Sequence, residues 1–440
     1  MSSIKKTNNI KIYILYFVIL TSFMDAYPVL PTVYKPIAIF YIAPFFLIFI
    51  FKNIRNIFLS NRSFSLFFLL YLLYFLYGFF ISIFFSRYDF YNYDGIIDYT
   101  LTFSIGIFSF YFYFVFFKSY AQETIDKAFD LIGKLVVSIG FVEILTMLGI
   151  VPQTVEDVIL TFFRGSGYGG RIVLINNEPA WAANTLMVFL AFFHYKKNKW
   201  FVLLIQTELL LSFSLKGYIM LFIFEVVRLL FIEKNYKSFF LLIIIIVLTI
   251  FFVNFLLLPT LSFFGFENTH FGRRFLLLSE YNLNFESIKY VLVDRGSGFV
   301  RIMYPYVGFL MFIDNPIGWG GGNYRFLLGD YIYKYPYAKF SGEVNANVEL
   351  LNGNPKNIFS RALSENGLLG FIIIIILSIN IGKKAKRQNN KLFQYFVLSL
   401  FCIFLQFDSY AYLPLYLILG LLYSRKNNNF NDRRLYENRI

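Results

Sequence analysis

Positively charged side chains gather in the two longest stretches that interrupt the apolar sequence. The guanidinium of arginine is planar and can donate to two oxygens of one phosphate at the same time. Such a concentration predicts a site for a phosphate-bearing substrate, whereas solvated loop charges or contacts with lipid headgroups are the structural alternative. The longer stretch contains Arg273, Arg274, Arg295, Arg301 and Arg325, with Lys289, Lys334, Lys339 and Lys356, and the shorter one contains Arg164 and Arg171.

A glycine-rich segment follows the mostly apolar residues 299–313 and reads Asp-Asn-Pro-Ile-Gly-Trp-Gly-Gly-Gly-Asn over 314–323. Glycine lacks a Cβ, so clustered glycines let backbone amides approach a ligand closely. They also form tight loops without any ligand. Asn315, Gly318 and Gly320 are therefore candidates for substrate binding. The apolar stretch itself, with Arg301 near its start, is typical of a helix that lies at a membrane surface.

Two charged residues mark the starts of apolar runs. Glu178 precedes Pro179, and an acid followed by proline is an ordinary way to begin a helix. A carboxylate that faces a cationic site would instead orient or deprotonate an acceptor hydroxyl. Lys216 interrupts apolar sequence, where an ionisable group is either functional or extends its stem to the interface. His270 is a further candidate base, or a solvated loop histidine.

Several other chemistries lack their sequence patterns. We find no Walker loop, dinucleotide fingerprint or zinc motif, which disfavours an energy-coupled pump. Cys402 is the only cysteine, so neither an intrachain disulfide nor a cysteine-based metal site is expected. The net charge of +14 lies mostly beside apolar runs, which is typical of membrane proteins and not of nucleic-acid binding. We expect no cofactor, no metal and no nucleic-acid partner.

The elements that position these residues are apolar and helical. Hydrophobic residues make up 58% of the chain and charged residues only 15%, against about a quarter in soluble proteins. A span needs roughly 20 apolar residues. The sequence predicts an all-α integral membrane protein, a polytopic bundle of about 12 transmembrane helices. The predicted spans lie near 10–26, 34–51, 63–85, 97–117, 129–149, 179–195, 200–214, 217–232, 238–258, 360–381, 392–406 and 410–423.

Lysine and arginine concentrate in alternate short loops, and such loops face the cytoplasm. Both termini are therefore predicted to be cytoplasmic. Residues 1–258 hold nine predicted helices and a smaller outer loop at about 150–178. Residues 259–359 form one long extracytoplasmic loop, residues 360–424 hold the last three helices, and residues 425–440 form a cytoplasmic tail.

Four local patterns follow one another along residues 170–375. They are Asn177-Glu178-Pro179, Ser214-Leu-Lys216-Gly217, Gly298-Phe-Val-Arg301 followed by Asn315-Pro-Ile-Gly-Trp-Gly320, and Asn357 followed by Glu365-Asn-Gly367-Leu-Leu-Gly370. In this order they resemble the patterns of the O-antigen polymerase (Wzy-type) and O-antigen ligase superfamily. One departure concerns the ligases, which usually carry histidine where Lys356 precedes Asn357; this disfavours a ligase and leaves the general base unassigned.

The resemblance implies a glycosyltransferase at the outer face of the bacterial cytoplasmic (inner) membrane. Such an enzyme transfers a glycan from undecaprenyl pyrophosphate to a sugar hydroxyl of another lipid-linked repeat unit of O-antigen or a similar surface polysaccharide. It also implies contact with membrane lipids and with a chain-length regulator protein. Arg301 and Glu178 are then the candidate catalytic residues, and Lys216, Asn357 and Glu365 join the loop residues above as substrate-binding candidates.

Two other functions stay open. A polysaccharide ligase is the nearest enzyme alternative, and a flippase or other transporter of lipid-linked oligosaccharides is the alternative without catalysis. Transporters usually keep their polar sites near the middle of the membrane. Here most polar residues belong to the predicted outer loops, which favours an enzyme.

Overall fold

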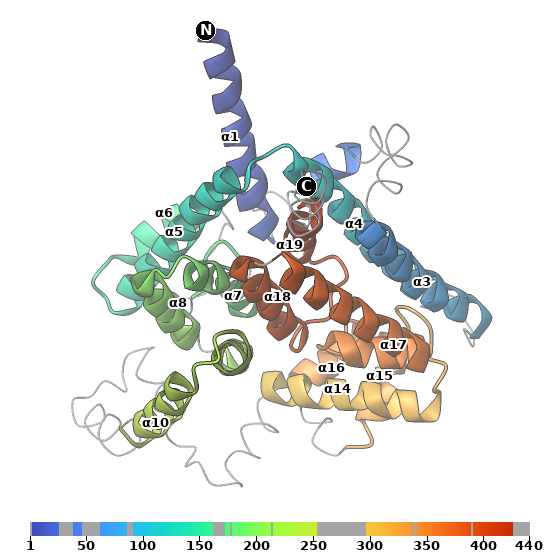
Figure 1. Cartoon of the computed structure of the whole chain (residues 1–440). Coiled ribbons are helices and arrows are strands. Elements are labelled where there is room, and N and C mark those ends of the chain that lie inside the picture. The colour runs from blue at the N-terminus through green and yellow to red at the C-terminus, as the bar shows by residue number, and fades with distance from the viewer. Residues whose placement is uncertain are drawn as a thin grey trace.

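All regular secondary structure is helical in the part of the chain that the structure, a computed structural model, describes (Figure 1). It describes residues 2–25, 38–45, 62–85, 91–161, 172–176, 178–212, 214–252, 296–335, 338, 341–388 and 390–425. No strand occurs in these ranges, and the predicted all-α class is confirmed for them.

Most predicted spans coincide with a helix. The span predicted at 34–51 lies largely outside the described residues. The helices that match predicted spans are α1 (Ser2–Phe23), α3 (Arg62–Phe85), α4 (Tyr91–Lys118), α5 (Gln122–Met147), α7 (Pro179–Tyr195), α8 (Lys199–Leu211), α9 (Leu215–Val227) with its π-helical continuation η1 (Arg228–Ile232), α10 (Tyr236–Phe252), α17 (Ile358–Arg387), α18 (Lys391–Phe404) and α19 (Leu413–Ser424).

The predicted number of spans is not confirmed. Three of the described helices contain segments long and apolar enough to cross a membrane, namely Phe64–Ile83, Tyr93–Lys118 and Ile358–Arg387. Several other apolar helices, among them Lys391–Phe404 and Leu413–Ser424, are shorter than the roughly 20 residues that a perpendicular span requires. For example, α8 and α9 have 13 residues each, because Ser212 and Ser214 separate them with a short connection.

The predicted outer loops contain helices of their own. The first holds α6 (Gln153–Thr161), and the second holds α14 (Gly296–Asp314), α15 (Tyr324–Ile332) and α16 (Gly342–Glu349). The helix expected over 299–313 is thus confirmed as α14. In Figure 1, α14, α15 and α16 lie beside α17, and α14 packs along it. A separate apolar cluster centred on Tyr304, Met311 and Leu328 joins these three helices.

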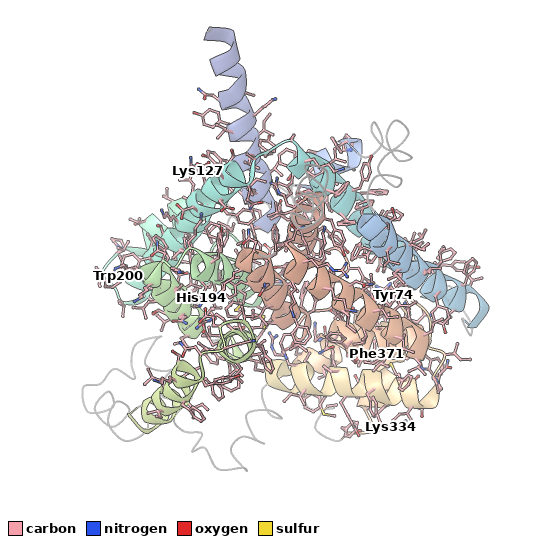
Figure 2. All side chains as sticks on the ribbon, viewed as in Figure 1. Tyr74, Lys127, His194, Trp200, Lys334 and Phe371 are labelled. Atoms are coloured by element: carbon pink, nitrogen blue, oxygen red, sulfur yellow. The ribbon has the colours of Figure 1, made fainter. Side chains whose placement is uncertain are left out.

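The main core surrounds α7, which α5, α8, α9 and α18 contact. Thirteen of its residues, from Pro179 to Phe193, are buried. Figure 2 shows how side chains fill the space between the helices. Tyr74 is fully buried and its hydroxyl lies 2.5 Å from that of Tyr410, whereas Trp200 at the edge is 79% exposed. The first and last parts of the chain therefore share one core.

Loops from distant parts of the chain meet at each end of this core. At one end, Lys196 Nζ lies 3.3 Å from Asp126, and Arg425 donates to the carbonyl of Tyr120 at 3.0 Å. The Tyr120 hydroxyl in turn donates to the carbonyl of Lys11 at 3.0 Å. At the opposite end lie the first residues of α7, α9 and α17 and the connection between α18 and α19. The residues Lys11, Tyr120, Lys196 and Arg425 therefore lie at the same end of the core, and the sequence predicted all of them to be on the same side of the membrane.

Candidate functional site

The first residues of α7 leave one carboxylate free of the helix. Pro179 occupies the first turn, where its missing N–H is no loss. Glu178 is the N-cap residue, yet its side chain makes no capping hydrogen bond within the described part of the chain and is exposed. The helix start therefore does not by itself explain this carboxylate.

Lys216 is buried in the first turn of α9, with 2% of its surface exposed. The serine hydroxyl of Ser214 caps this helix and fixes where the turn begins. The Lys216 ammonium lies over the Phe407 ring, 4.5 Å from its centroid. Among the residues that the structure describes, no carboxylate lies within 4.0 Å of it. A buried ammonium without such a partner is energetically expensive.

Two further cations interact electrostatically with Lys216. Arg301 comes from the beginning of α14, and Lys356 comes from the residue before the N-cap of α17, in a left-handed conformation with φ +58°. Burial lowers the pKa of Arg301, and the carboxylates Glu343 and Glu178 act in the opposite direction. We use the name cationic cluster for Lys216 and the four charged residues that interact electrostatically with it. Its members are Lys216, Arg301, Lys356, Glu178 and Asp408.

Asp408 is the residue of this cluster that the sequence analysis missed. It lies in the short connection between α18 and α19, and 6% of its surface is exposed. Its Oδ2 atom has no hydrogen-bond partner among the described residues. A signal was available, because Asp408 is the only charged residue between Lys391 and Arg425.

Glu365 lies next to the cluster but is already paired. Its Oε2 atom is 3.0 Å from Nε of Arg361, one helical turn earlier in α17, and both side chains are almost completely buried. Arg361 also donates through Nη1 to the carbonyl of Asp408 at 3.0 Å and lies 4.4 Å from the centroid of the Tyr410 ring. The pair therefore links α17 to the connection after α18. This structural role in the ion pair is the alternative to substrate binding by Glu365.

Asn357 is the N-cap of α17. Its Oδ1 accepts from the backbone N–H groups of Phe359 and Ser360 at 2.8 and 3.1 Å. Its Nδ2 donates to the carbonyl of Leu405 at 2.9 Å. Both ends of the amide thus hold the beginning of α17 against the end of α18, and a role in substrate binding would compete with these bonds.

The glycine-rich turn packs against a break in α17. Gly367 has φ +60° and ψ −158°, which interrupts the helix and frees backbone groups. The turn satisfies them: Gly320 N–H donates to the carbonyl of Glu365 at 2.8 Å, and Leu368 N–H donates to the carbonyl of Pro316 at 2.9 Å. The Nδ2 atom of Asn315 closes the turn on the Gly318 carbonyl at 2.8 Å.

The glycines themselves are explained by these backbone contacts. Gly318 and Gly320 have φ of +99° and +93°, a region that side-chain-bearing residues rarely adopt. A Cβ on Gly318 would lie 2.5 Å from the backbone nitrogen of Gly367, and one on Gly320 would lie 2.6 Å from the Cα of Ser82 in α3. The turn approaches protein backbone on two sides, which favours the structural interpretation of Gly318 and Gly320.

The remaining candidates lie elsewhere. Arg325 forms an ion pair with Asp98 of α4, at 2.6 Å between Nη1 and Oδ2, and is not part of the cationic cluster. Arg164, Arg171, Arg273, Arg274 and Arg295 lie outside the described residues. Within the described ranges, no group of three or more His, Cys, Asp or Glu side chains is arranged to hold a metal ion.

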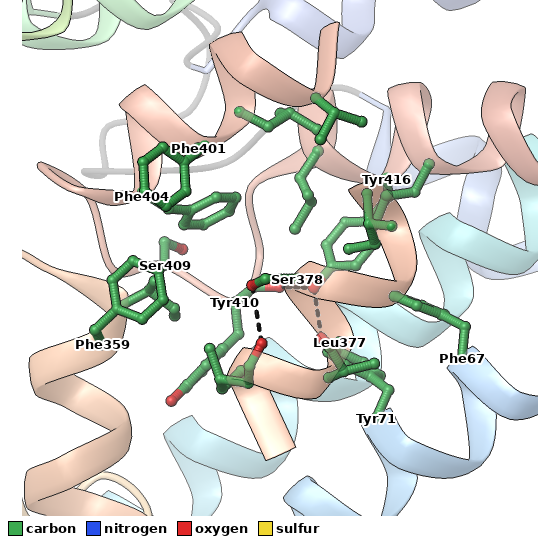
Figure 3. Close-up of a pocket in the computed structure, with 17 residues that line it drawn as sticks. Phe67, Tyr71, Phe359, Leu377, Ser378, Phe401, Phe404, Ser409, Tyr410 and Tyr416 are labelled. Carbon is green, nitrogen blue, oxygen red and sulfur yellow. Dashed lines mark hydrogen bonds between the residues drawn. The ribbon is translucent and has the colours of Figure 1, made fainter. Parts of the chain in front are cut away.

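An apolar cavity of about 140 Å³ lies among α3, α17, α18 and α19 (Figure 3). Its lining includes Phe359 of α17 and Ser409, the residue after Asp408, and consists mostly of apolar side chains of α3, α17, α18 and α19. Inside it, the hydroxyls of Tyr71 and Tyr416 lie 2.5 Å apart.

Comparison with known proteins gives no match: no model of a protein family fits the chain, and no curated protein matches it by sequence.

Proposed function

We propose that this chain is a polymerase of lipid-linked polysaccharide repeat units. It would transfer a glycan from undecaprenyl pyrophosphate to the sugar hydroxyl of a second lipid-linked unit at the outer face of the bacterial cytoplasmic membrane. The observation that carries the proposal is the Lys216 ammonium, buried without a carboxylate within 4.0 Å in the described part of the chain and accompanied by Arg301 and Lys356. Three cations from separate segments that interact electrostatically would suit a multiply charged anion.

A pyrophosphate leaving group matches such a site. In the transfer, the acceptor hydroxyl oxygen forms a bond to the anomeric carbon of the donor sugar. The bond between that carbon and the pyrophosphate oxygen breaks, its electron pair leaves with undecaprenyl pyrophosphate, and a carboxylate takes the hydroxyl proton. Negative charge therefore grows on the leaving group in the transition state, where cations already held in place stabilise it most.

The residues divide this work by position. Arg301 and Lys216 would hold the pyrophosphate, with Lys356 adding charge at the beginning of α17. Glu178 is exposed and interacts electrostatically with both Arg301 and Lys216, so it would orient the acceptor sugar from the solvent side.

The apolar cavity supports a lipid-linked substrate. A soluble sugar nucleotide would need no apolar surface beside its phosphates, whereas a polyprenyl chain gains free energy from each buried CH₂, about 0.8 kcal/mol. The cavity lining, which includes Phe359, Leu400 and Phe401, is mostly apolar, and it contains Ser409, the residue after Asp408.

The arrangement of loops supports the proposed topology of about 12 spans with both termini in the cytoplasm. The lysine- and arginine-rich connections meet at one end of the core, and the cationic cluster lies at the other end, with three of its members at or just before the first turn of α7, α9 and α17. Helices shorter than a full span, such as α8 and α9, would be completed by their π-helical or non-helical continuations.

Deletion of the gene in the native host tests the proposal. Loss of the polysaccharide ladder, with single repeat units still attached to the surface, is the result expected for a polymerase. Loss of all transferred polysaccharide would instead indicate a ligase. Accumulation of lipid-linked units on the cytoplasmic side would indicate a flippase. An unchanged ladder would overturn the proposal.

A further inference from the structure

We infer that Asp408 is the general base of this transfer, the carboxylate that receives the proton of the acceptor hydroxyl. The inference rests on the proposed function. It concerns a residue outside the four sequence patterns described above, in the connection between α18 and α19.

The environment of the Asp408 carboxylate is unusual. The residue is 6% exposed, and its Oδ2 atom has no hydrogen-bond donor among the described residues. Two cations interact with it electrostatically, Lys216 from α9 and Arg361 from α17, yet no cation of the described residues lies within 4.0 Å of its oxygens. A buried carboxylate oxygen without a donor is costly, and a sugar hydroxyl would supply the missing donor.

The connection that carries Asp408 is held firmly. Asn357 Nδ2 donates to the carbonyl of Leu405, and Arg361 Nη1 donates to the carbonyl of Asp408 itself. The Phe407 ring packs against Trp181 of α7, with 4.7 Å between the ring centroids, and carries the Lys216 ammonium on its face. Elements from three helices therefore hold the backbone that carries this carboxylate, as a positioned base requires.

The other carboxylates near the cluster are less suited to the role. Glu365 is ion-paired with Arg361. Glu178 and Glu343 are exposed, so water competes for their oxygens. Of these four carboxylates, only that of Asp408 is buried and has an oxygen, Oδ2, without a hydrogen-bond donor in the described part of the chain.

The proton transfer balances with the bond changes. As the acceptor oxygen bonds to the anomeric carbon, its O–H bond breaks and the proton goes to a carboxylate oxygen of Asp408. The electron pair of the broken anomeric C–O bond leaves with undecaprenyl pyrophosphate. Asp408 then returns the proton to water, so no external co-reactant is needed.

The test compares Asp408→Asn with wild type and with Asp126→Asn, the same substitution at the opposite end of the core. Two quantities are measured: the polysaccharide ladder in a deletion strain at equal protein level, and binding of undecaprenyl pyrophosphate to purified protein in nanodiscs. We expect Asp408→Asn to reduce polymer formation by about 100-fold or more while binding stays within about twofold of wild type. Asp126→Asn should form the full ladder.

A full-length ladder from Asp408→Asn would overturn the inference, and so would loss of binding equal to the loss of polymer. If Asp408→Asn does not fold, Asp408→Glu and Asp408→Gln are compared instead. The two new side chains have the same length, but only that of glutamate carries a carboxylate. A rate clearly higher for Glu supports the base, and equal rates overturn it. Failure of the proposed function looks different, because the wild-type protein would then neither bind undecaprenyl pyrophosphate nor restore the ladder.

Discussion

The ammonium of Lys216 lies 4.5 Å from the centre of the Phe407 ring, which joins the first turn of α9 to the connection between α18 and α19. The ring face carries partial negative charge and attracts the cation. It offers no hydrogen-bond acceptor comparable to a carboxylate, so the three N–H donors of the ammonium stay available to an anion. The contact therefore holds the lysine in position without neutralising it.

This geometry makes Lys216→Met the first prediction. Methionine retains most of the stem and removes the charge, so undecaprenyl pyrophosphate should bind about 10- to 100-fold more weakly, as expected for loss of a hydrogen bond to a charged group. Stability should stay the same or rise, because a buried charge has been removed. Binding in nanodiscs and thermal unfolding measure the two effects. The matched control is Lys196→Met at the opposite end, and equal affinities in both variants would contradict the prediction.

The second prediction concerns Arg301→Lys. A pyrophosphate favours a forked donor, and lysine supplies only a point charge. Polymer formation should fall about 100- to 1,000-fold, the effect of losing one oriented donor, while protein level and membrane insertion persist. Chain length is measured on a gel beside an immunoblot. Arg387→Lys, an exposed arginine at the far end of α17, should keep the wild-type ladder. If Arg301→Lys also kept it, Arg301 would have no part in the site.

The third prediction distinguishes two roles for the glycine-rich turn. Gly318→Ala combines an unfavourable φ of +99° with a Cβ only 2.5 Å from the backbone of Gly367. Gly149→Ala shares a positive φ of +72°, but no atom lies within 4 Å of its Cβ. Both should cost about 1–3 kcal/mol in backbone strain, and Gly318→Ala should be clearly less stable than Gly149→Ala. Thermal unfolding measures the difference. A Gly318→Ala protein of unchanged stability that fails to bind substrate would support the ligand interpretation instead.

The positions of most helices were predictable because an apolar run leaves the backbone no water to bond with, and a helix satisfies its own groups. The helix over 299–313 was expected for the same reason. The number of complete spans was not, because Ser212 and Ser214 end α8 and begin α9 within a single apolar run. Capping serines act locally, and hydropathy averaged over a window does not register them.

The candidate site was predictable only in part. Lys216, Arg301 and Glu178 were candidates from the sequence, and they interact electrostatically in the structure. Asp408 and Arg361 were missed because their importance depends on contacts between residues 47 positions apart in the chain. The spacing of Arg361 and Glu365, one helical turn, is compatible with an ion pair on a single helix, but it does not indicate that the pair is buried. The docking of the glycine-rich turn on Gly367 had no local signal.

The fourth prediction is topological. In a Cys402→Ser background, Glu343→Cys should react with an impermeant thiol reagent on intact cells, because α16 belongs to the predicted outer loop. Lys386→Cys, at the basic end of α17, should react only after the membrane is permeabilised. Both parent residues are exposed, so burial does not limit labelling. The reverse labelling pattern would invert the topology and with it the side on which the cationic cluster faces.

The last prediction separates a structural role of Glu365 from substrate binding. Glu365→Gln leaves the Arg361 guanidinium buried without its carboxylate, which should destabilise the protein by about 3–5 kcal/mol. The double variant Arg361→Met/Glu365→Leu removes both charges and should recover much of that stability, because an apolar pair of similar volume has no desolvation cost. Thermal unfolding of the single and double variants, measured as a double-mutant cycle, gives the coupling between the two residues. A substrate-binding glutamate behaves differently: Glu365→Gln would then unfold like wild type and lose affinity for undecaprenyl pyrophosphate. That outcome would return Glu365 to the binding site and leave Arg361 as its orienting partner.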